Sequence, residues 1–174
     1  MLQLKEIEKP FPKDSEVLVK VAAVSLNDWD WGLLHGDPVN RIMFGLIKPK
    51  KKILGSDIAG RIEAIGKNVS KFKIGDEVYG DLSSSWGGLA EYVCAPENAL
   101  ALKPSAMSFI NAASIPQAAM LAVQGLIDIG QIKQGQKILI NGAGGGVGTF
   151  AIQIAKKYGV EVTGVDSAAK LDML

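Results

Sequence analysis

The sequence predicts a two-part fold: a small antiparallel β-barrel or sandwich, followed by the start of a doubly wound α/β domain. Before Pro104, short β-branched runs alternate with turn residues and no helical period separates them. After Pro104, an alanine-rich helical segment leads into a strand, a glycine-rich turn, a helix and a second strand. We therefore expect residues 1–106 to form the first domain. Residues 107–174 would supply linking helices and the first β-α-β unit of an incomplete second domain.

Composition narrows the class of protein. The chain has 174 residues, a formal net charge of +1 and a single cysteine, Cys94. Nucleic-acid-binding proteins usually carry a marked basic excess, so we expect no nucleic-acid partner. One cysteine excludes an intrachain disulfide and a multi-cysteine metal site. The long uncharged stretches are interrupted by Pro, Asn, Gln or glycine clusters, so we expect no membrane span and a cytoplasmic protein.

The first part is predicted to be made of strands joined by tight turns. The predicted strands cover residues 17–24, 58–65, 77–79 and 90–94. Turn residues separate them, at Asn68, Gly75-Asp76, Gly87-Gly88 and Pro96.

The second part contains a β-α-β pattern. Residues 107–130 are predicted to be helical, with Pro116 restarting the helix. Residues 137–141 form a short apolar strand, and a helix follows the glycine-rich turn and ends at Gly159. The second strand, residues 161–165, ends at Asp166.

The glycine-rich turn carries the clearest chemical signal. Its spacing, Ala-x-Gly-x-x-Gly, is the dinucleotide fingerprint with Ala in the first place, and its residues are Ala143, Gly144, Gly145, Gly146, Val147 and Gly148. A pyrophosphate needs backbone N–H donors at close range, which a side chain at Gly145 would block. Asp166 follows Gly148 by 18 positions, close to where a carboxylate reaches the ribose hydroxyls. The alternative is a purely structural turn.

The same segment leaves the choice between NAD and NADP open. A carboxylate at Asp166 favours NAD, because it repels the 2′-phosphate of NADP. Ser167 and Lys170 could instead bind that phosphate.

Five segments in a fixed order form a further pattern. They are Ser25-Leu-Asn-Asp-Trp-Asp30, Gly55-Ser-Asp-Ile-Ala-Gly60, Gly66-x-x-Val69-x-x-Phe72-Lys-x-Gly75-Asp-x-Val78, Gly88-Leu-Ala-Glu-Tyr92 and Asn141–Lys156. Together they resemble the quinone oxidoreductase branch of the medium-chain dehydrogenase/reductase superfamily. The resemblance implies a GroES-like β-barrel catalytic domain followed by a Rossmann domain, with the nicotinamide in the cleft between them. It spans the chain but only about half of the family's usual length, so we expect an incomplete Rossmann domain.

The resemblance also implies an active site without zinc. The Cys and His ligands of related alcohol dehydrogenases fall at Asn27 and Ser56, and no Cys or His lies between residues 116 and 124. Asn27 matches the family's Asn beside the nicotinamide and Asp30 the acidic residue after it, which makes both candidate catalytic residues. An Asx turn closing the first strand would also explain them, and the two roles are compatible.

The function implied is NAD(P)H-dependent hydride transfer to a quinone or an α,β-unsaturated carbonyl. We expect a homo-oligomer, because two parallel strands alone leave an unpaired edge and apolar faces that favour association. The alternative is a truncated or degenerate family member that binds a nucleotide or a partner without catalysis.

In this sequence the turn after Asp30 departs from the family pattern. We expect Cys94 to be a core residue, His35 a surface residue, and the basic run at residues 48–52 a solvated loop.

Overall fold

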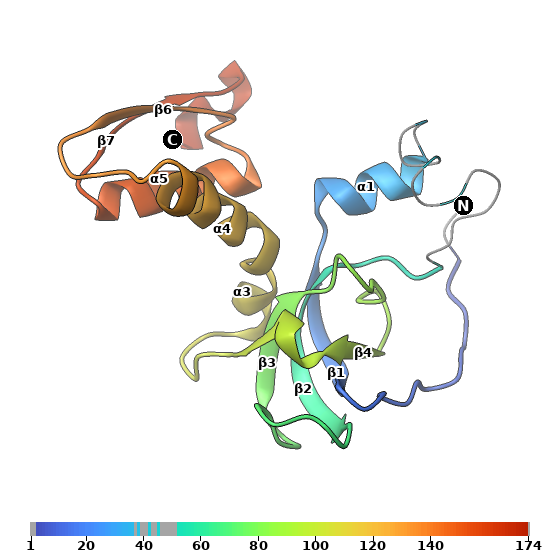
Figure 1. Ribbon diagram of the computed structural model, residues 1–174. Coiled ribbons are helices and arrows are strands. Elements are labelled where there is room, and N and C mark those ends of the chain that lie inside the picture. The colour runs from blue at the N-terminus through green and yellow to red at the C-terminus, as the bar shows by residue number, and fades with distance from the viewer. Residues whose placement is uncertain (1–2, 37, 39–41, 43–44, 46–51, 174) are drawn as a thin grey trace. The chain divides into compact units, whose positions relative to one another are not determined.

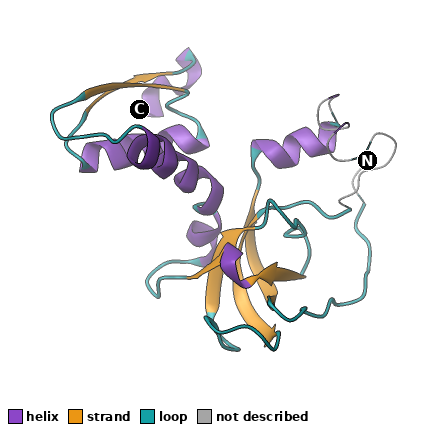
Figure 2. Ribbon diagram, viewed as in Figure 1, coloured by secondary structure: helices purple, strands orange, loops and turns teal. Residues whose placement is uncertain are grey.

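The chain folds into two compact units. The computed structural model describes residues 3–36, 38, 42, 45 and 52–173 (Figure 1). The first unit is Met1–Ser114 and the second is Ile115–Leu174. Strands dominate the first unit and helices the second, as Figure 2 shows. The expected order, a β domain followed by an α/β segment, is confirmed.

The first unit is built on one antiparallel sheet of five strands in the order β4-β1-β2-β3-β5. The strands are β1 (Glu16–Ser25), β2 (Asp57–Ile65), β3 (Glu77–Asp81), β4 (Tyr92–Pro96) and β5 (Leu100–Leu102). The first four lie where the sequence predicts strands. Only β5 was not predicted, and its three residues depend on pairing with β3.

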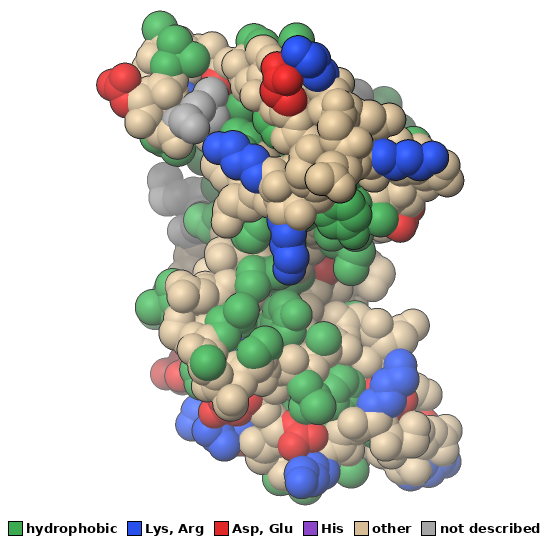
Figure 3. All heavy atoms as spheres, turned by 90° about the vertical axis from the view of Figure 1, so that its left-hand side faces the viewer, with side chains coloured by type: hydrophobic (Ala, Val, Ile, Leu, Met, Phe, Trp, Pro, Cys, Tyr) green, Lys and Arg blue, Asp and Glu red, His purple; other side chains and the backbone are tan. Residues whose placement is uncertain are grey.

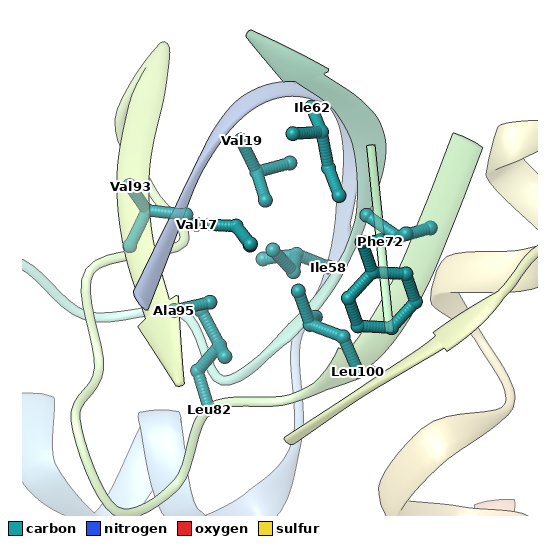
Figure 4. Packing of buried hydrophobic residues seen from close by; sticks show 10 residues of the cluster. Val17, Val19, Ile58, Ile62, Phe72, Leu82, Val93, Ala95 and Leu100 are labelled. Carbon is teal, nitrogen blue, oxygen red and sulfur yellow. The ribbon is translucent and has the colours of Figure 1, made fainter. Parts of the chain in front are cut away.

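The core of this unit lies on one face of the sheet. Successive strand residues point to opposite faces, so every second side chain enters the core. Val17 and Val19 of β1 are fully buried, and Ile58 and Ile62 of β2 are buried beside them. In Figure 4 these side chains point toward one another, and Phe72, from the loop before β3, fills the space next to them.

A short helix, α3 (Phe109–Ala113), belongs to the first unit. Ala112 and Ala113 are buried against Ala59 of β2, and these small side chains let the helix lie close to the sheet. The compact unit therefore continues to Ser114, whereas the sequence places the boundary after residue 106.

The second unit contains the predicted β-α-β element. It consists of α4 (Pro116–Val123), a π-helical turn (Gln124–Ile129), β6 (Lys137–Asn141), α5 (Gly146–Lys157), β7 (Glu161–Val165) and a 3₁₀ segment (Ala168–Met173). Strands β6 and β7 are parallel and in register, from Lys137 opposite Glu161 to Asn141 opposite Val165.

The two faces of this strand pair differ. Ile138 of β6 and Val162 of β7 pack with Ala155 of α5. The opposite face is open, with Leu139 67% exposed and Val165 42% exposed.

On the face of the molecule drawn in Figure 3, apolar side chains reach the surface and basic side chains lie apart from one another. Among the described residues, no helix is long and apolar enough to cross a membrane.

Candidate functional site

Asn27 caps a helix that the sequence analysis did not predict. It is the N-cap of α1 (Asp28–His35), and it forms a capping box with Asp30. In this box the Asn27 backbone N–H donates to Asp30 Oδ2 at 2.9 Å. The helix ends at Gly36, whose φ of 62° is left-handed. The spacing of the cap, Asn-x-x-Asp, was the available signal, since a cap residue followed by an acceptor at the third helical position marks a helix start.

Asp30 also links α1 to the segment before β2. Its Oδ1 accepts the Gly55 N–H at 2.8 Å, so each carboxylate oxygen holds one backbone N–H. The side chain is buried, and the residue is only 4% exposed. Asp30 thus joins two backbone segments that are 25 residues apart in sequence.

Glycine is required where this second segment passes the loop after β3. Gly55 has a φ of +91°, and a Cβ there would lie 2.6 Å from the Leu89 backbone nitrogen. The Gly88 N–H donates to the Gly55 carbonyl at 2.9 Å. A side chain at Gly55 would therefore push the two loops apart and move Ser56.

The predicted catalytic Asn27 meets Ser56 in space. Asn27 Nδ2 donates to Ser56 Oγ at 3.4 Å, although the two residues are 29 positions apart, and Ser56 is fully buried. The two positions at which the resemblance places the zinc ligands of related alcohol dehydrogenases therefore converge here, and an amide and a hydroxyl occupy them. Among the described residues, no group of three or more His, Cys, Asp or Glu side chains could hold a metal ion. Motif alignment pointed to position 56, but no pattern in the sequence identified Gly55 and Ser56 as partners of the Asp30–Asn27 pair.

The single cysteine and the single histidine of the chain take no part in the contact between Asn27 and Ser56. Cys94 is partly buried in β4, and burial raises the pKa of its thiol to about 11, with the Glu16 carboxylate adding to the shift. The thiol therefore stays protonated near neutral pH. His35 is exposed at the end of α1, and its ring centroid lies 4.2 Å from that of Trp31. Residues 48–51 of the basic run lie outside the described residues.

The glycine-rich turn connects β6 to α5 in the second unit. The backbone N–H groups of Gly142 and Ala143 donate to the Val165 carbonyl at 2.8 and 3.1 Å, which fixes the turn on the end of β7. Gly145 is the N-cap of α5, and no side chain caps this helix. A glycine-rich turn at a helix N-terminus fits a phosphate group, because N–H groups and the helix dipole both favour an anion.

Gly148 lets α5 start directly against this turn. A Cβ at this position would lie 2.2 Å from the Gly142 carbonyl oxygen and 2.6 Å from the Ala143 carbonyl oxygen. Both atoms belong to the backbone, so neither could move aside without moving the turn. Ala143 itself is fully buried.

Asp166 lies beside the same turn. Its Oδ2 accepts the Gly144 N–H at 2.8 Å, its Oδ1 accepts the Ser167 N–H at 2.7 Å, and Lys170 Nζ lies 3.9 Å from Oδ1. These bonds, first that from Ser167 and then that from Gly144, hold the pKa of the Asp166 carboxyl below its usual range. The structure thus gathers the predicted cofactor-binding residues of the turn with Asp166, Ser167 and Lys170.

The chain matches known proteins over nearly its whole length. Residues 13–105 match the alcohol dehydrogenase GroES-like domain. The chain is 37% identical over 177 residues to the chloroplastic quinone-oxidoreductase homolog of Spinacia oleracea, covering 97% of this chain. It belongs to the quinone oxidoreductase branch of the medium-chain dehydrogenase/reductase superfamily. The chloroplastic NADPH-dependent alkenal/one oxidoreductase of Arabidopsis thaliana is 35% identical over 174 residues, 95% of this chain.

A solved structure agrees with the sequence comparison. The quinone oxidoreductase from Coxiella burnetii superposes with a TM-score of 0.88 at 33% identity, over 98% of this chain and 54% of that one. The chain spans 52% of the spinach protein and 44% of the Arabidopsis protein. It thus matches about half of its relatives' length.

Proposed function

We propose that the gene product is a zinc-independent, NAD(P)H-dependent oxidoreductase that transfers hydride to a quinone or an α,β-unsaturated carbonyl. The observation that carries this proposal is the pairing of Asn27 with Ser56 at the positions where related alcohol dehydrogenases place zinc ligands. Oxidation of a simple alcohol without a metal would lack its Lewis acid. Conjugated acceptors accept hydride at an electron-poor carbon and need only hydrogen-bond donors at the oxygen that gains charge.

Asn27 is the proposed donor to that oxygen. An amide has two N–H donors, and the bond to Ser56 uses one of them. The second can stabilise negative charge on an acceptor oxygen without any change in protonation. Asp30 belongs to the same loop by its capping box with Asn27.

The dinucleotide, when bound, supplies the hydride. We assign its pyrophosphate to the first backbone N–H groups of α5, at Gly146 to Gly148, because the N–H groups of Gly144 and Gly145 already donate to Asp166 and Gly142. We assign its ribose to Asp166, with Ser167 and Lys170 beside it. The lowered pKa of Asp166 supports a charged carboxylate at neutral pH, which favours NADH. A relative named as NADPH-dependent points the other way, so we propose NAD(P)H as the cofactor class.

The test is an assay of the full-length gene product. We expect oxidation of NADH or NADPH when a quinone or an enone is added, no stoichiometric zinc in the purified protein, and unchanged activity with chelators. Asn27→Ala should lower kcat. Absence of hydride transfer to any acceptor would contradict the proposal and favour a protein that binds nucleotide without turnover. Sedimentation of the protein measures its mass in solution and so tests the expected homo-oligomer. The cytoplasmic location also stays a prediction.

A further inference from the structure

We propose that Asp30 is a positioning residue. By accepting two backbone N–H bonds it holds the side-chain amide of Asn27 in place, and it does not donate the proton in the reduction. This inference rests on the proposed function, and it assigns Asp30 a different task from Asn27 within the same loop.

Each oxygen of the Asp30 carboxylate holds one backbone N–H group. Oδ2 accepts the Asn27 N–H at 2.9 Å and Oδ1 accepts the Gly55 N–H at 2.8 Å. Both bonds fall in the ordinary range for N–H donors. Because Asp30 is 4% exposed, an acceptor molecule or solvent has little access to either oxygen. A general acid must reach the atom that it protonates.

These two bonds of Asp30 fix the position of Asn27 relative to Ser56. Asn27 and Ser56 each lie in or next to one of the two segments that Asp30 joins, since Ser56 follows Gly55 directly. The bond from Asn27 Nδ2 to Ser56 Oγ is long, at 3.4 Å, so it holds the amide only weakly by itself. The two charge-assisted backbone bonds of Asp30 are therefore the stronger restraint on the distance between Asn27 and Ser56.

The neighbouring acid, Asp28, differs from Asp30 in its surroundings. Asp28 stands in the same first turn of α1 with the same charge, but its side chain is exposed. Asp28 thus provides a matched control, because both carboxylates favour the helix N-terminus and only Asp30 joins the two segments.

The experiment is a double-mutant cycle in the full-length gene product. Asn at position 30 keeps the size of the side chain, but its amide NH₂ can no longer accept one of the two N–H groups. We expect Asp30→Asn to lower kcat roughly 10- to 100-fold, since small displacements of a catalytic group have effects of this size. The KM for the dinucleotide should not change, because the glycine-rich turn lies in the other compact unit. Asp28→Asn should leave kcat unchanged.

The decisive comparison uses Asn27→Ala as the background. If Asp30 acts only through Asn27, Asp30→Asn causes no further loss of kcat once the amide is gone. An additional loss of similar size would show an independent role, such as proton donation, and would overturn the inference. Unchanged kcat in Asp30→Asn alone would overturn it too. If wild type transfers no hydride, or Asn27→Ala keeps full kcat, the proposed function fails and the inference with it.

A second variant covers the case in which Asp30→Asn does not fold. Ser56→Ala leaves both N–H bonds of Asp30 intact and removes the hydroxyl that the Asn27 amide contacts. We expect a smaller fall in kcat, again absent in the Asn27→Ala background. Hydrogen exchange of the Gly55 amide gives a readout without turnover. It should be slow in wild type and Asp28→Asn, and fast exchange in both would contradict the bond to Asp30.

Discussion

At the scale of single residues, Asp166 is the side chain most directly connected to cofactor choice. Its carboxylate accepts N–H groups from Gly144 and Ser167, and Lys170 lies within ion-pair distance. A charged carboxylate at the end of the second strand binds ribose hydroxyls and repels a 2′-phosphate. The position of Lys170 shows why the sequence left this choice open, since its cation could neutralise Asp166 or bind a phosphate.

We predict that Asp166→Ser shifts the preference of the protein toward NADPH. Removing the carboxylate removes the repulsion and leaves Lys170 without its nearby anion. The ratio of kcat/KM for NADPH to that for NADH should rise roughly tenfold, which corresponds to about 1.4 kcal/mol. The control is Asp172→Ser, because Asp172 is an exposed carboxylate on the 3₁₀ segment that follows Asp166. An unchanged ratio in Asp166→Ser would show that Asp166 does not contact the ribose.

At the scale of elements, the contact between α5 and the glycine-rich turn depends on one missing side chain. We predict that Gly148→Ala destabilises the second unit, because its Cβ would overlap backbone atoms of Gly142 and Ala143. Overpacking of this kind costs about 1–3 kcal/mol, more than the ~1 kcal/mol by which Ala improves a helix over Gly. Dinucleotide affinity should fall as the turn moves.

Gly125→Ala is the matched control for this substitution. Gly125 also lies in a helical segment, and a Cβ there would meet no atom within 4 Å. Urea unfolding should show a stability equal to or slightly above that of wild type for this variant. Equal stability of the Gly148→Ala and Gly125→Ala proteins would mean that α5 does not need the close approach.

A buried lysine connects the sheet of the first unit to the segment that leads into α3. Lys103 Nζ donates to the Met107 carbonyl at 2.6 Å and the Pro104 carbonyl at 3.1 Å, and it lies 2.9 Å from Glu77 Oε2. Its side chain is 4% exposed. We predict that Lys103→Met lowers the free energy of unfolding by about 2 kcal/mol, because the partly buried Met107 carbonyl and the Glu77 carboxylate lose their charged donor.

The control is Lys67→Met. Lys67 forms an ion pair with Asp14 at 3.0 Å, but its side chain is 73% exposed. Exposed pairs contribute about 0–1 kcal/mol, so stability should change little. Thermal unfolding of both variants compares them, and a similar, small effect of both would contradict the structural role of Lys103.

The elements differ in how well the sequence predicted them. Strands β1 and β6 and helix α5 follow from alternation, apolar spacing and glycine turns, which are local patterns. Helix α1 was missed because its residues, with Trp29, Trp31 and Gly32, favour no helix, although the cap was visible in the sequence. Helix α3 lies within the stretch 107–130 that is predicted to be helical, but the sequence does not show that it joins the first unit through Ala112 and Ala113. Such tertiary contacts leave no local trace in the sequence.

The sequence also predicted some parts of the candidate site better than others. The proposed cofactor residues lie together because one β-α-β unit and the segment directly after it hold them all, so the motif alone predicted that they would be close. The resemblance pointed to Asn27 and Ser56 separately, as the positions of zinc ligands in related alcohol dehydrogenases. The contact between these two residues and the bond from Gly55 to Asp30 could not be predicted, because they depend on two loops that meet only in the fold.

At the scale of the whole molecule, three carboxyl groups make the free energy of unfolding depend on pH. The pKa of Glu77 is lowered, first by the hydrogen bond from Lys103, and that of Glu97 is lowered by the backbone N–H groups of Lys71 and Ser70. The pKa of Asp166 in the second unit is lowered as well. A carboxyl group whose pKa is lower in the folded than in the unfolded chain stabilises the fold above its unfolded pKa. That contribution is lost as the pH falls through the folded pKa.

We therefore predict that the free energy of unfolding decreases as the pH is lowered from about 7 to about 3, with most of the loss below the ordinary carboxyl pKa of about 4. Denaturant midpoints measured across this range check it. Glu77→Gln with Glu97→Gln should lower stability at neutral pH and flatten the acid dependence, because these two groups then no longer take up protons on unfolding. Glu6→Gln with Glu8→Gln is the control, since both side chains are exposed. Equal slopes for the two double variants would show that Glu77 and Glu97 are not linked to folding.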